Sequence, residues 1–516
     1  MTTRVLVFAC VALIAGAGIL QAQPPDQTPA GSDLPVSLLS QLDVTLASIE
    51  LADGSELAER TDRSSADQQT FDWAAQGRAC EGCPPRSVGR AVFQSTMINT
   101  FYGLANLLRG HDTAKITPKT WWANMEDGWV WDLNDFPVNQ IGHPYQGNNY
   151  FTSGRANGLS FYESSAVAAF GSATWEYFGE TNPASLNDFI NTTLGGIALG
   201  EMFHRTAWLV RDTRATGRGR MWREIAATAF DPVGGYNNFT RGDGGRVYDK
   251  PADMVPSGLG AVAALGALWR GQENGSISDA SGQAFLEVDL LYGDTRSGRT
   301  RTPYDAFGVR LRFGGGSSFS EARVRGRLVG EPLASEKLHF SVIQTYDYQN
   351  NDAYATGSQS FDAALGFTQP LSSRFGFWVL GWGGLTILGA VDSLPPGVTD
   401  VPEEGGDDAH SANTGPRFYD YGPGSNFGVT TQLTHDRRII AGFFYEGRHM
   451  YSLDGVRANH FLQRARLDLM LPVRGAFGFG ASAEYFNRHT FYQDATNSER
   501  EFHYPQVRAY LTWTPD

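Results

Sequence analysis

The feature that most constrains this chain is an alternation of apolar and polar residues, repeatedly interrupted by Gly, Asp, Asn and Pro, from about residue 280 to the end. In YDAFGVRLRF, Val309 and Leu311 share one face while Arg310 and Arg312 share the other. A period of two indicates β-strands with one apolar and one polar face. About eleven such segments, each roughly the length of a tilted membrane strand, are separated by turn residues. They include FLEVDLLY, FSEARVRGRLV, FDAALGFT, IIAGFFYE, RARLDLML, FGFGASAEY and VRAYLTW.

The position of the aromatic residues separates a membrane barrel from a soluble sandwich. Tyr and Trp gather at the ends of the expected strands: Tyr292, Tyr304, Tyr346, Tyr348, Trp378, Trp382, Tyr485, Tyr510 and Trp513. Rings with one polar end settle at the headgroup level of a membrane. The opposite face carries Arg, Asp and Glu, which would be costly in a dry sandwich core. We therefore predict an antiparallel transmembrane β-barrel over residues 280–516, with twelve strands or, as the alternative, ten.

Composition and the N-terminus place the chain in the bacterial envelope. The chain has 60 Gly, 12% aromatic residues and a net charge of −14, which is typical of outer-membrane barrels. Its acidity argues against nucleic acid as a partner. Residues 1–22 have the charge, apolar run and small residues of a signal peptide. Residues 23–85 are expected to form a flexible periplasmic leader, with Cys80 and Cys83 as a local disulfide.

Between residues 86 and 272 the apolar period becomes helical, which predicts a helical domain before the barrel and an α+β fold class. We expect helices over 87–110, 160–180, 183–212, 218–230 and 257–271. Ser87 is the candidate N-cap of the first helix, and Gly110 ends it. The segment IGHPYQGNNYFTSGRANG, residues 141–158, fits neither period and is interpreted as a polar loop.

Polar residues are concentrated in this loop and on the helices after it. The candidate site residues are Asp135, Asn139, His143, Arg155, Glu176, Glu180, Asp188, Glu201 and His204. Buried charges need partners, so these groups could form a structural network. Alternatively, His143 or His204 could act as a general base paired with Glu176 or Glu201 on a lipid or glycan. We predict no metal or other cofactor, because the ExxH motif of di-metal carboxylate sites occurs once where two copies are needed.

Three fragments of this region resemble a known family. WDLNDFPVNQIGHPYQGNNYFTSGRANGLSFYESS, SATWEYFGE and PASLNDFINTTLGGIALGE follow one another in the order of a bacterial envelope family described only as domain of unknown function 3943. The resemblance covers about residues 95–240. It implies an envelope location and usually a β-rich region downstream, and it implies no activity. Its motif positions carry His143, Arg155, Glu176, Glu180, Asp188 and Glu201.

The combined expectation is a Gram-negative outer-membrane barrel with a periplasmic helical domain that caps or plugs its lumen. The expected role is passage or docking of an envelope component rather than catalysis. The alternatives are a lipid- or glycan-modifying enzyme and a structural envelope anchor. Outer-membrane lipid and the barrel-assembly machinery are the expected partners. The acidic insertion at residues 393–415 is expected to be an extracellular loop.

Overall fold

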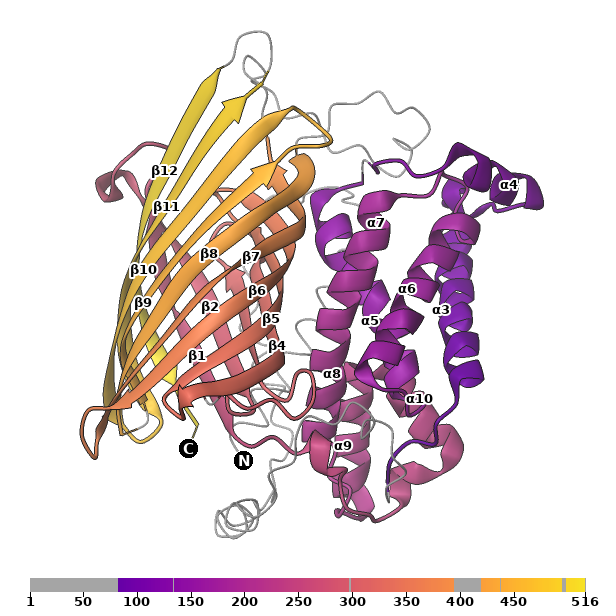
Figure 1. The fold of residues 1–516 in the computed structure, drawn as a ribbon, viewed down its shortest axis with the longest axis horizontal. Coiled ribbons are helices and arrows are strands. Elements are labelled where there is room, and N and C mark those ends of the chain that lie inside the picture. Colours follow the sequence, from indigo (N-terminus) through magenta and orange to yellow (C-terminus); the bar gives the residue numbers. More distant parts are fainter. Residues whose placement is uncertain are drawn as a thin grey trace, which may run out of the picture.

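The computed structural model describes residues 82–132, 134–296, 298–393, 419–436, 438–493 and 498–515. The predicted signal peptide, nearly all of the leader with Cys80, and the acidic insertion after Ser393 lie outside the described residues. Cys83 is disulfide-bonded. The described chain forms a group of helices followed by a β-barrel (Figure 1).

Most of the predicted helices are confirmed. The main helical elements are α3 (Val88–Arg109), α4 (Pro118–Asp127), η4 (Val138–Gly142), α5 (His143–Arg155), α6 (Phe161–Phe178), α7 (Leu186–Ile190), η5 (Asn191–Gly195), α8 (Gly196–Val210), α9 (Gly217–Phe230) and α10 (Pro232–Arg241). Ser87 caps the start of α3, and Gly110 ends it with a φ of 88°, which favours glycine. Ser160 and Glu163 form a capping box at the start of α6. None of the described helices combines the length with the apolar character that crossing a membrane requires.

The segment 141–158 was wrongly expected to be a loop. It belongs to the continuous helix η4–α5, which is buried on almost every side. A helix with neighbours all round has no polar face, so its sequence lacks the usual helical period. Its glycines allow the close packing: a side chain at Gly147 would collide with the Thr192 carbonyl oxygen, and one at Gly154 with Ser164.

Twelve antiparallel strands form a closed barrel in which each strand pairs with the next and β1 pairs with β12. They are β1 (Leu259–Arg270), β2 (Ser281–Tyr292), β3 (Phe307–Gly314), β4 (Phe319–Ser335), β5 (Leu338–Asn350), β6 (Ala355–Pro370), β7 (Phe375–Asp392), β8 (Tyr419–His435), β9 (Arg438–Tyr451), β10 (Ala458–Arg474), β11 (Phe477–Tyr492) and β12 (Glu499–Trp513). The predicted twelve-stranded barrel is confirmed. The predicted helix over 257–271 is wrong, because this Ala- and Leu-rich run is β1; short apolar runs fit both a buried helix and a strand.

Connections differ at the two ends of the barrel. At one end, tight turns join β4 to β5, β6 to β7, β8 to β9 and β10 to β11, and β12 ends there as well; the longer β2–β3 connection, residues 293–306, is the exception at this end. At the other end, longer connections join β1 to β2 and β7 to β8. Mostly short turns on one side, the longest loop on the other and a charged interior are typical of an outer-membrane β-barrel, in which the short turns face the periplasm.

The helices pack against the outer face of the barrel wall. Phe136 stacks on Tyr348 with ring centroids 5.7 Å apart, and the Tyr346 hydroxyl donates to the Gln140 carbonyl oxygen at 2.7 Å. Asp347, between these two tyrosines on β5, points the opposite way and pairs with Arg323 in the lumen. Figure 1 shows the helices beside the barrel, with α8 next to β4 and β5. The predicted plug or cap of the lumen is therefore not confirmed.

Candidate functional site

Ion pairs between opposite walls cross the lumen. Arg323 on β4 reaches Glu446 on β9 at 2.9 Å. Glu321, also on β4, lies 3.0 Å from Arg464 on β10. Neither β9 nor β10 is a neighbour of β4 in the sheet, so these pairs can form only across the interior. All four side chains are buried.

Aromatic rings complete the packing of the lumen. The Arg464 guanidinium lies 5.3 Å from the centre of the Phe486 ring, and that of Arg325 lies 4.1 Å from the centre of the Trp382 ring. The Tyr510 hydroxyl donates to Asp468 at 3.4 Å. Trp382 and Tyr510 thus face the lumen, whereas the sequence placed them at the membrane interface. Their partners are charged side chains in the lumen, and the alternation of apolar and polar residues does not predict these contacts.

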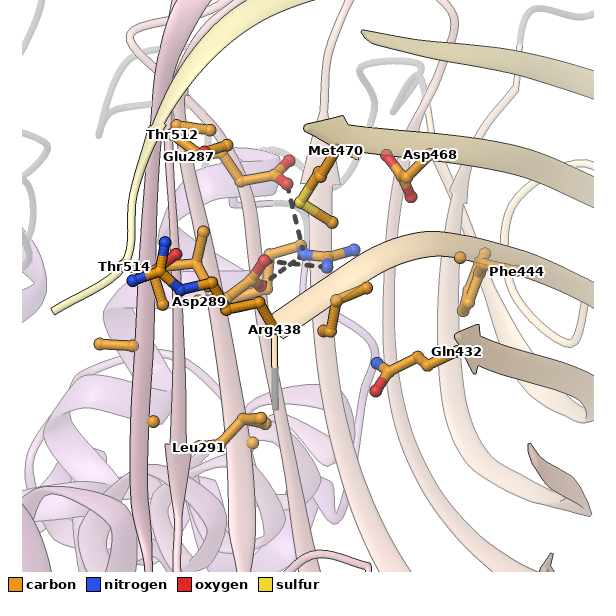
Figure 2. Close-up of a pocket in the computed structure, with 18 of the residues that line it drawn as sticks. Glu287, Asp289, Leu291, Gln432, Arg438, Phe444, Asp468, Met470, Thr512 and Thr514 are labelled. Carbon is orange, nitrogen blue, oxygen red and sulfur yellow. Dashed lines mark hydrogen bonds and ion pairs between the residues drawn. The ribbon is translucent and has the colours of Figure 1, made fainter. Parts of the chain in front are cut away.

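A cavity of about 330 Å³ lies at the short-turn end of the lumen. Its lining includes Phe477 at the β10–β11 turn and Arg438 at the start of β9. Figure 2 shows the lining side chains of several strands pointing into it. Its charged lining consists of Arg296, Arg310, Arg323, Arg325, Arg438 and Arg466 with Glu287, Asp289 and Asp468.

Arginine outnumbers carboxylate in this lining, six to three. All three carboxylates are paired: Arg310 lies 2.7 Å from Asp289, Arg466 lies 2.8 Å from Asp468, and Arg508 lies 2.9 Å from Glu287. Two of the six arginines, Arg323 and Arg325, are paired in turn with Glu446 of the opposite wall, so the excess of positive charge comes from the other four. Arginine binds carboxylate and phosphate groups through its planar fork of donors. The cavity is therefore suited to an anionic group. The sequence did not reveal this cavity, because the alternation marked the inward arginines without showing which of them share one end of the lumen.

A second candidate site lies in the helical domain. One ligand atom from each of Asp132, His143 and Asp188 lies within 4.8 Å of the other two. His143 Nε2 is 3.6 Å from Asp188 Oδ1, and its Nδ1 is 3.3 Å from the Thr192 hydroxyl. The Asn187 amide donates to Asp188 at 2.9 Å. One imidazole and two carboxylates form a donor set that suits zinc, iron or manganese.

Two further carboxylates adjoin this carboxylate–histidine cluster. Glu176 accepts a hydrogen bond from the Ser185 backbone N–H at 2.9 Å, and Glu180 accepts one from the Trp175 indole at 2.8 Å. Burial raises the pKa of Glu176 well above its ordinary value, and the nearby Glu180 raises it further. Burial and the neighbouring Asp132 likewise raise the pKa of Asp188. Carboxyl groups in this situation take up a proton or a cation.

Glu201 is held differently. It lies 2.9 Å from Arg155 and 2.8 Å from Arg205, and it is fully buried. Burial alone would raise the pKa of Glu201, but the two guanidinium groups hold it below its ordinary value. Arg205 also donates to the Pro303 carbonyl oxygen at 3.0 Å, which ties this group to the β2–β3 connection. Sequence analysis missed Arg205, although its i, i+4 spacing from Glu201 was a usable signal.

The remaining predicted residues fall into separate contacts. His204 Nδ1 is 2.9 Å from Asp231, a partner that the sequence did not indicate. The Asn139 amide donates to the Tyr419 hydroxyl on the barrel at 2.8 Å, and the Asp135 backbone oxygen accepts from the Asn139 N–H. The residues predicted to form one network thus lie in several separate groups, with His143 beside Asp188 in one and His204 beside Asp231 in another.

The fold and these sites define an outer-membrane β-barrel with an added helical domain. Residues 128–233 match the model of a family described as Domain of unknown function (DUF3943). This segment holds the carboxylate–histidine cluster, Glu201 and Asp231. No curated protein matches the chain.

Solved structures similar to the chain are outer-membrane barrels of several kinds. The NanC porin shares 7% identity over 48% of this chain and 98% of its own, with a TM-score of 0.24. The KdgM porin shares 6% identity over 48% and 98%, with a TM-score of 0.21. The outer membrane protease OmpT from Escherichia coli shares 8% over 50% and 97%, with a TM-score of 0.20.

Proposed function

We propose that the protein docks an anionic group of an envelope component at the short-turn end of its barrel and does not act as an open pore. The observation that carries this proposal is the lumen, where ion pairs between opposite walls lie beyond an arginine-rich cavity. In outer-membrane barrels this end faces the periplasm. The anionic group, a phosphate or a carboxylate, would enter from that side.

Passage through the barrel would require the crossing pairs to separate. Arg323, Glu446, Arg464 and Glu321 would then be buried charges without their partners. Breaking one buried pair costs about 3–5 kcal/mol. Docking in the cavity leaves these pairs intact, so it is the less costly use of this lumen.

Planar-bilayer recording and phosphate binding test the proposal together. We expect the full-length protein to give no steady conductance and to bind a short-chain alkyl phosphate in titration calorimetry. Arg438→Gln removes a cavity arginine near the mouth and should weaken this binding. Arg374→Gln, on another short turn and paired with Asp436, is the matched control and should bind normally. Steady conductance of the unmodified protein, or equal binding by both variants, would contradict the proposal.

A second candidate function rests on the carboxylate–histidine cluster. If Asp132, His143 and Asp188 hold a divalent cation, the ion would supply a water of lowered pKa for hydrolysis of a lipid or glycan. The observation that favours it is the placement of this donor set inside the segment that matches the family.

Metal content tests the second candidate before any substrate is known. Full-length protein equilibrated with zinc or manganese and then dialysed should retain one ion per chain. His143→Ala should lose that ion, whereas His204→Ala, which alters the separate pair with Asp231, should keep it. Absence of retained metal in the unmodified protein would remove this candidate.

A further inference from the structure

We infer that the helical domain lies in the hydrocarbon layer of the outer membrane beside the barrel, with the exposed apolar face of α3 against lipid acyl chains. The helices occupy the outer wall, which in a membrane barrel is the surface that lipid covers. A domain on that wall displaces lipid and shares its layer. The periplasm is not adjacent to this wall except at its short-turn end.

Contacts between the helices and the wall run from one end of the barrel to the other. At the short-turn end, Arg205 binds the Pro303 carbonyl oxygen, and the Tyr292 hydroxyl donates to the Met254 carbonyl oxygen at 3.2 Å. At the long-loop end, Trp131 stacks on Tyr421 near the start of β8, with ring centroids 5.7 Å apart. The helical domain therefore covers the full height of this part of the wall.

The outward side of α3 is an apolar stripe. Its exposed residues are Phe93 (61%), Met97 (43%), Phe101 (69%), Leu104 (52%) and Leu108 (79%). They are three or four positions apart, so they share one face of the helix. The side-chain amides of Gln94 and Asn99 point the other way: Gln94 donates to Asn237 at 2.6 Å, and Asn99 donates to the Gly171 carbonyl oxygen at 3.1 Å. Such a large apolar surface is unfavourable in water.

The polar groups of α3 are arranged as lipid requires. Residues 91–108 contain no charged side chain, and Arg90 and Arg109 flank them. At 1.5 Å per residue this stretch is about 27 Å long, close to the roughly 30 Å of a hydrocarbon core. Two exposed hydroxyls in it donate to carbonyl oxygens of their own helix, Thr96 to Val92 at 3.1 Å and Thr100 to Thr96 at 3.0 Å. Both are therefore satisfied without water.

Packing inside the helical domain also has membrane character. Helices approach through small residues: a side chain at Gly196 would come within 2.6 Å of Gly147 Cα, and one at Gly171 would meet Ser95 and Tyr150. Small residues at contacts and polar side chains bonded across helices are typical of helix association in lipid.

Continuity with the bare wall favours lipid over a protein partner. On the part of the barrel that the helices leave uncovered, Leu469 is 53% and Leu471 is 70% exposed, as high as the α3 stripe. The apolar surface also continues onto α6 and α10, where Phe170 is 40% and Phe239 is 85% exposed. A protein interface would instead form a bounded patch with a polar rim.

Spin-label accessibility in bilayers tests this placement. Single cysteines replace Phe101 on the stripe, Leu469 on the bare wall and Lys115 beyond the end of α3, each in the full-length protein in phosphatidylethanolamine-rich vesicles. Leu469→Cys is the lipid reference, and Lys115, with 63% of its side chain exposed, gives the water reference. Oxygen reports lipid exposure, and a charged nickel complex reports water exposure.

The expected result is an oxygen-to-nickel accessibility ratio at Phe101→Cys close to that at Leu469→Cys and several-fold above that at Lys115→Cys. A ratio like that of Lys115→Cys would place α3 in water and overturn the inference. Low access to both reagents would mean that a protein covers the stripe and would overturn it as well. Leu104→Cys, on the same face, serves as a second site if Phe101→Cys does not fold.

Discussion

Two parts of the barrel's outer wall follow the same alternation but have different outer surfaces. On the uncovered part, β10 and β12 present Leu467, Leu469 and Leu511, each about half exposed (48%, 53% and 52%). On the covered part, β5 presents Tyr346 and Tyr348, both buried against the helices. A ring with a hydroxyl is useful where a protein neighbour offers an acceptor, as the Gln140 carbonyl does for Tyr346. The outward residues of the two parts therefore differ in their contacts: the leucines stay half exposed, whereas the tyrosines are buried against protein and Tyr346 donates a hydrogen bond to it.

The largest loss of stability is expected from a change at Glu201, which anchors the helical domain that covers the wall. Glu201→Gln removes the negative charge that compensates the buried guanidinium groups of Arg155 and Arg205. The free energy of unfolding should fall by about 3–5 kcal/mol. Urea unfolding of the protein in bilayers measures it. Asp249→Asn alters the exposed Arg214–Asp249 pair and should cost about 1 kcal/mol or less. Equal losses for the two variants would argue against a buried anchor at Glu201.

A smaller loss of stability is expected from changes at the contacts between helices within the helical domain. Gly196→Ala puts a methyl group against the Gly147 backbone and should cost about 1–3 kcal/mol through overpacking. Gly103→Ala on α3 meets nothing within 4 Å and should stabilise the helix by about 0.5–1 kcal/mol. Thermal unfolding followed by circular dichroism compares the two. If Gly196→Ala were also stabilising, the close contact between α5 and α8 would be incorrect.

The smallest effect concerns the tyrosines themselves. Tyr346→Phe removes the hydroxyl that donates to the Gln140 carbonyl oxygen and should cost about 1 kcal/mol. Tyr485→Phe, at a site 45% exposed, should be nearly neutral. Unfolding midpoints of the two variants under one set of conditions give the comparison, and a neutral Tyr346→Phe would weaken the distinction between the two parts of the wall.

The elements that were predicted correctly are those whose type and ends are determined by a few adjacent residues. Ser87 and Gly110 marked the ends of α3, because caps are read from a few adjacent residues. Alternation predicted about eleven strands after residue 280, and the segments that it singled out fall in β2–β4, β6 and β9–β12. Periodicity failed for β1, which is rich in Ala and Leu without regular polar positions, and for α5, which is buried on almost every side.

The candidate sites depended on contacts that no local pattern encodes. His143 and Asp188 were predicted to be polar network members, but their closeness to Asp132 comes from the packing of α5 and α7 against the segment before α5. The partnership of His204 with Asp231 likewise joins α8 to the start of α10. The position of the helices outside the lumen could not be predicted from the sequence either, because Tyr346 and Tyr348 suit a membrane interface and a protein interface equally.

Cysteine cross-linking at the wall tests most directly whether the helical domain packs outside the barrel. A Cβ at Gly357 on β6 would lie 3.0 Å from Gln140 Cγ, which is within reach of a disulfide between cysteines at these two positions. Ser358, the next residue, points into the lumen, where Arg448 donates to it. Mass spectrometry of oxidised Gln140→Cys/Gly357→Cys protein should recover the linked peptides, and Gln140→Cys/Ser358→Cys should yield none. Linkage to position 358 without linkage to position 357 would place the helices in the lumen and contradict the account.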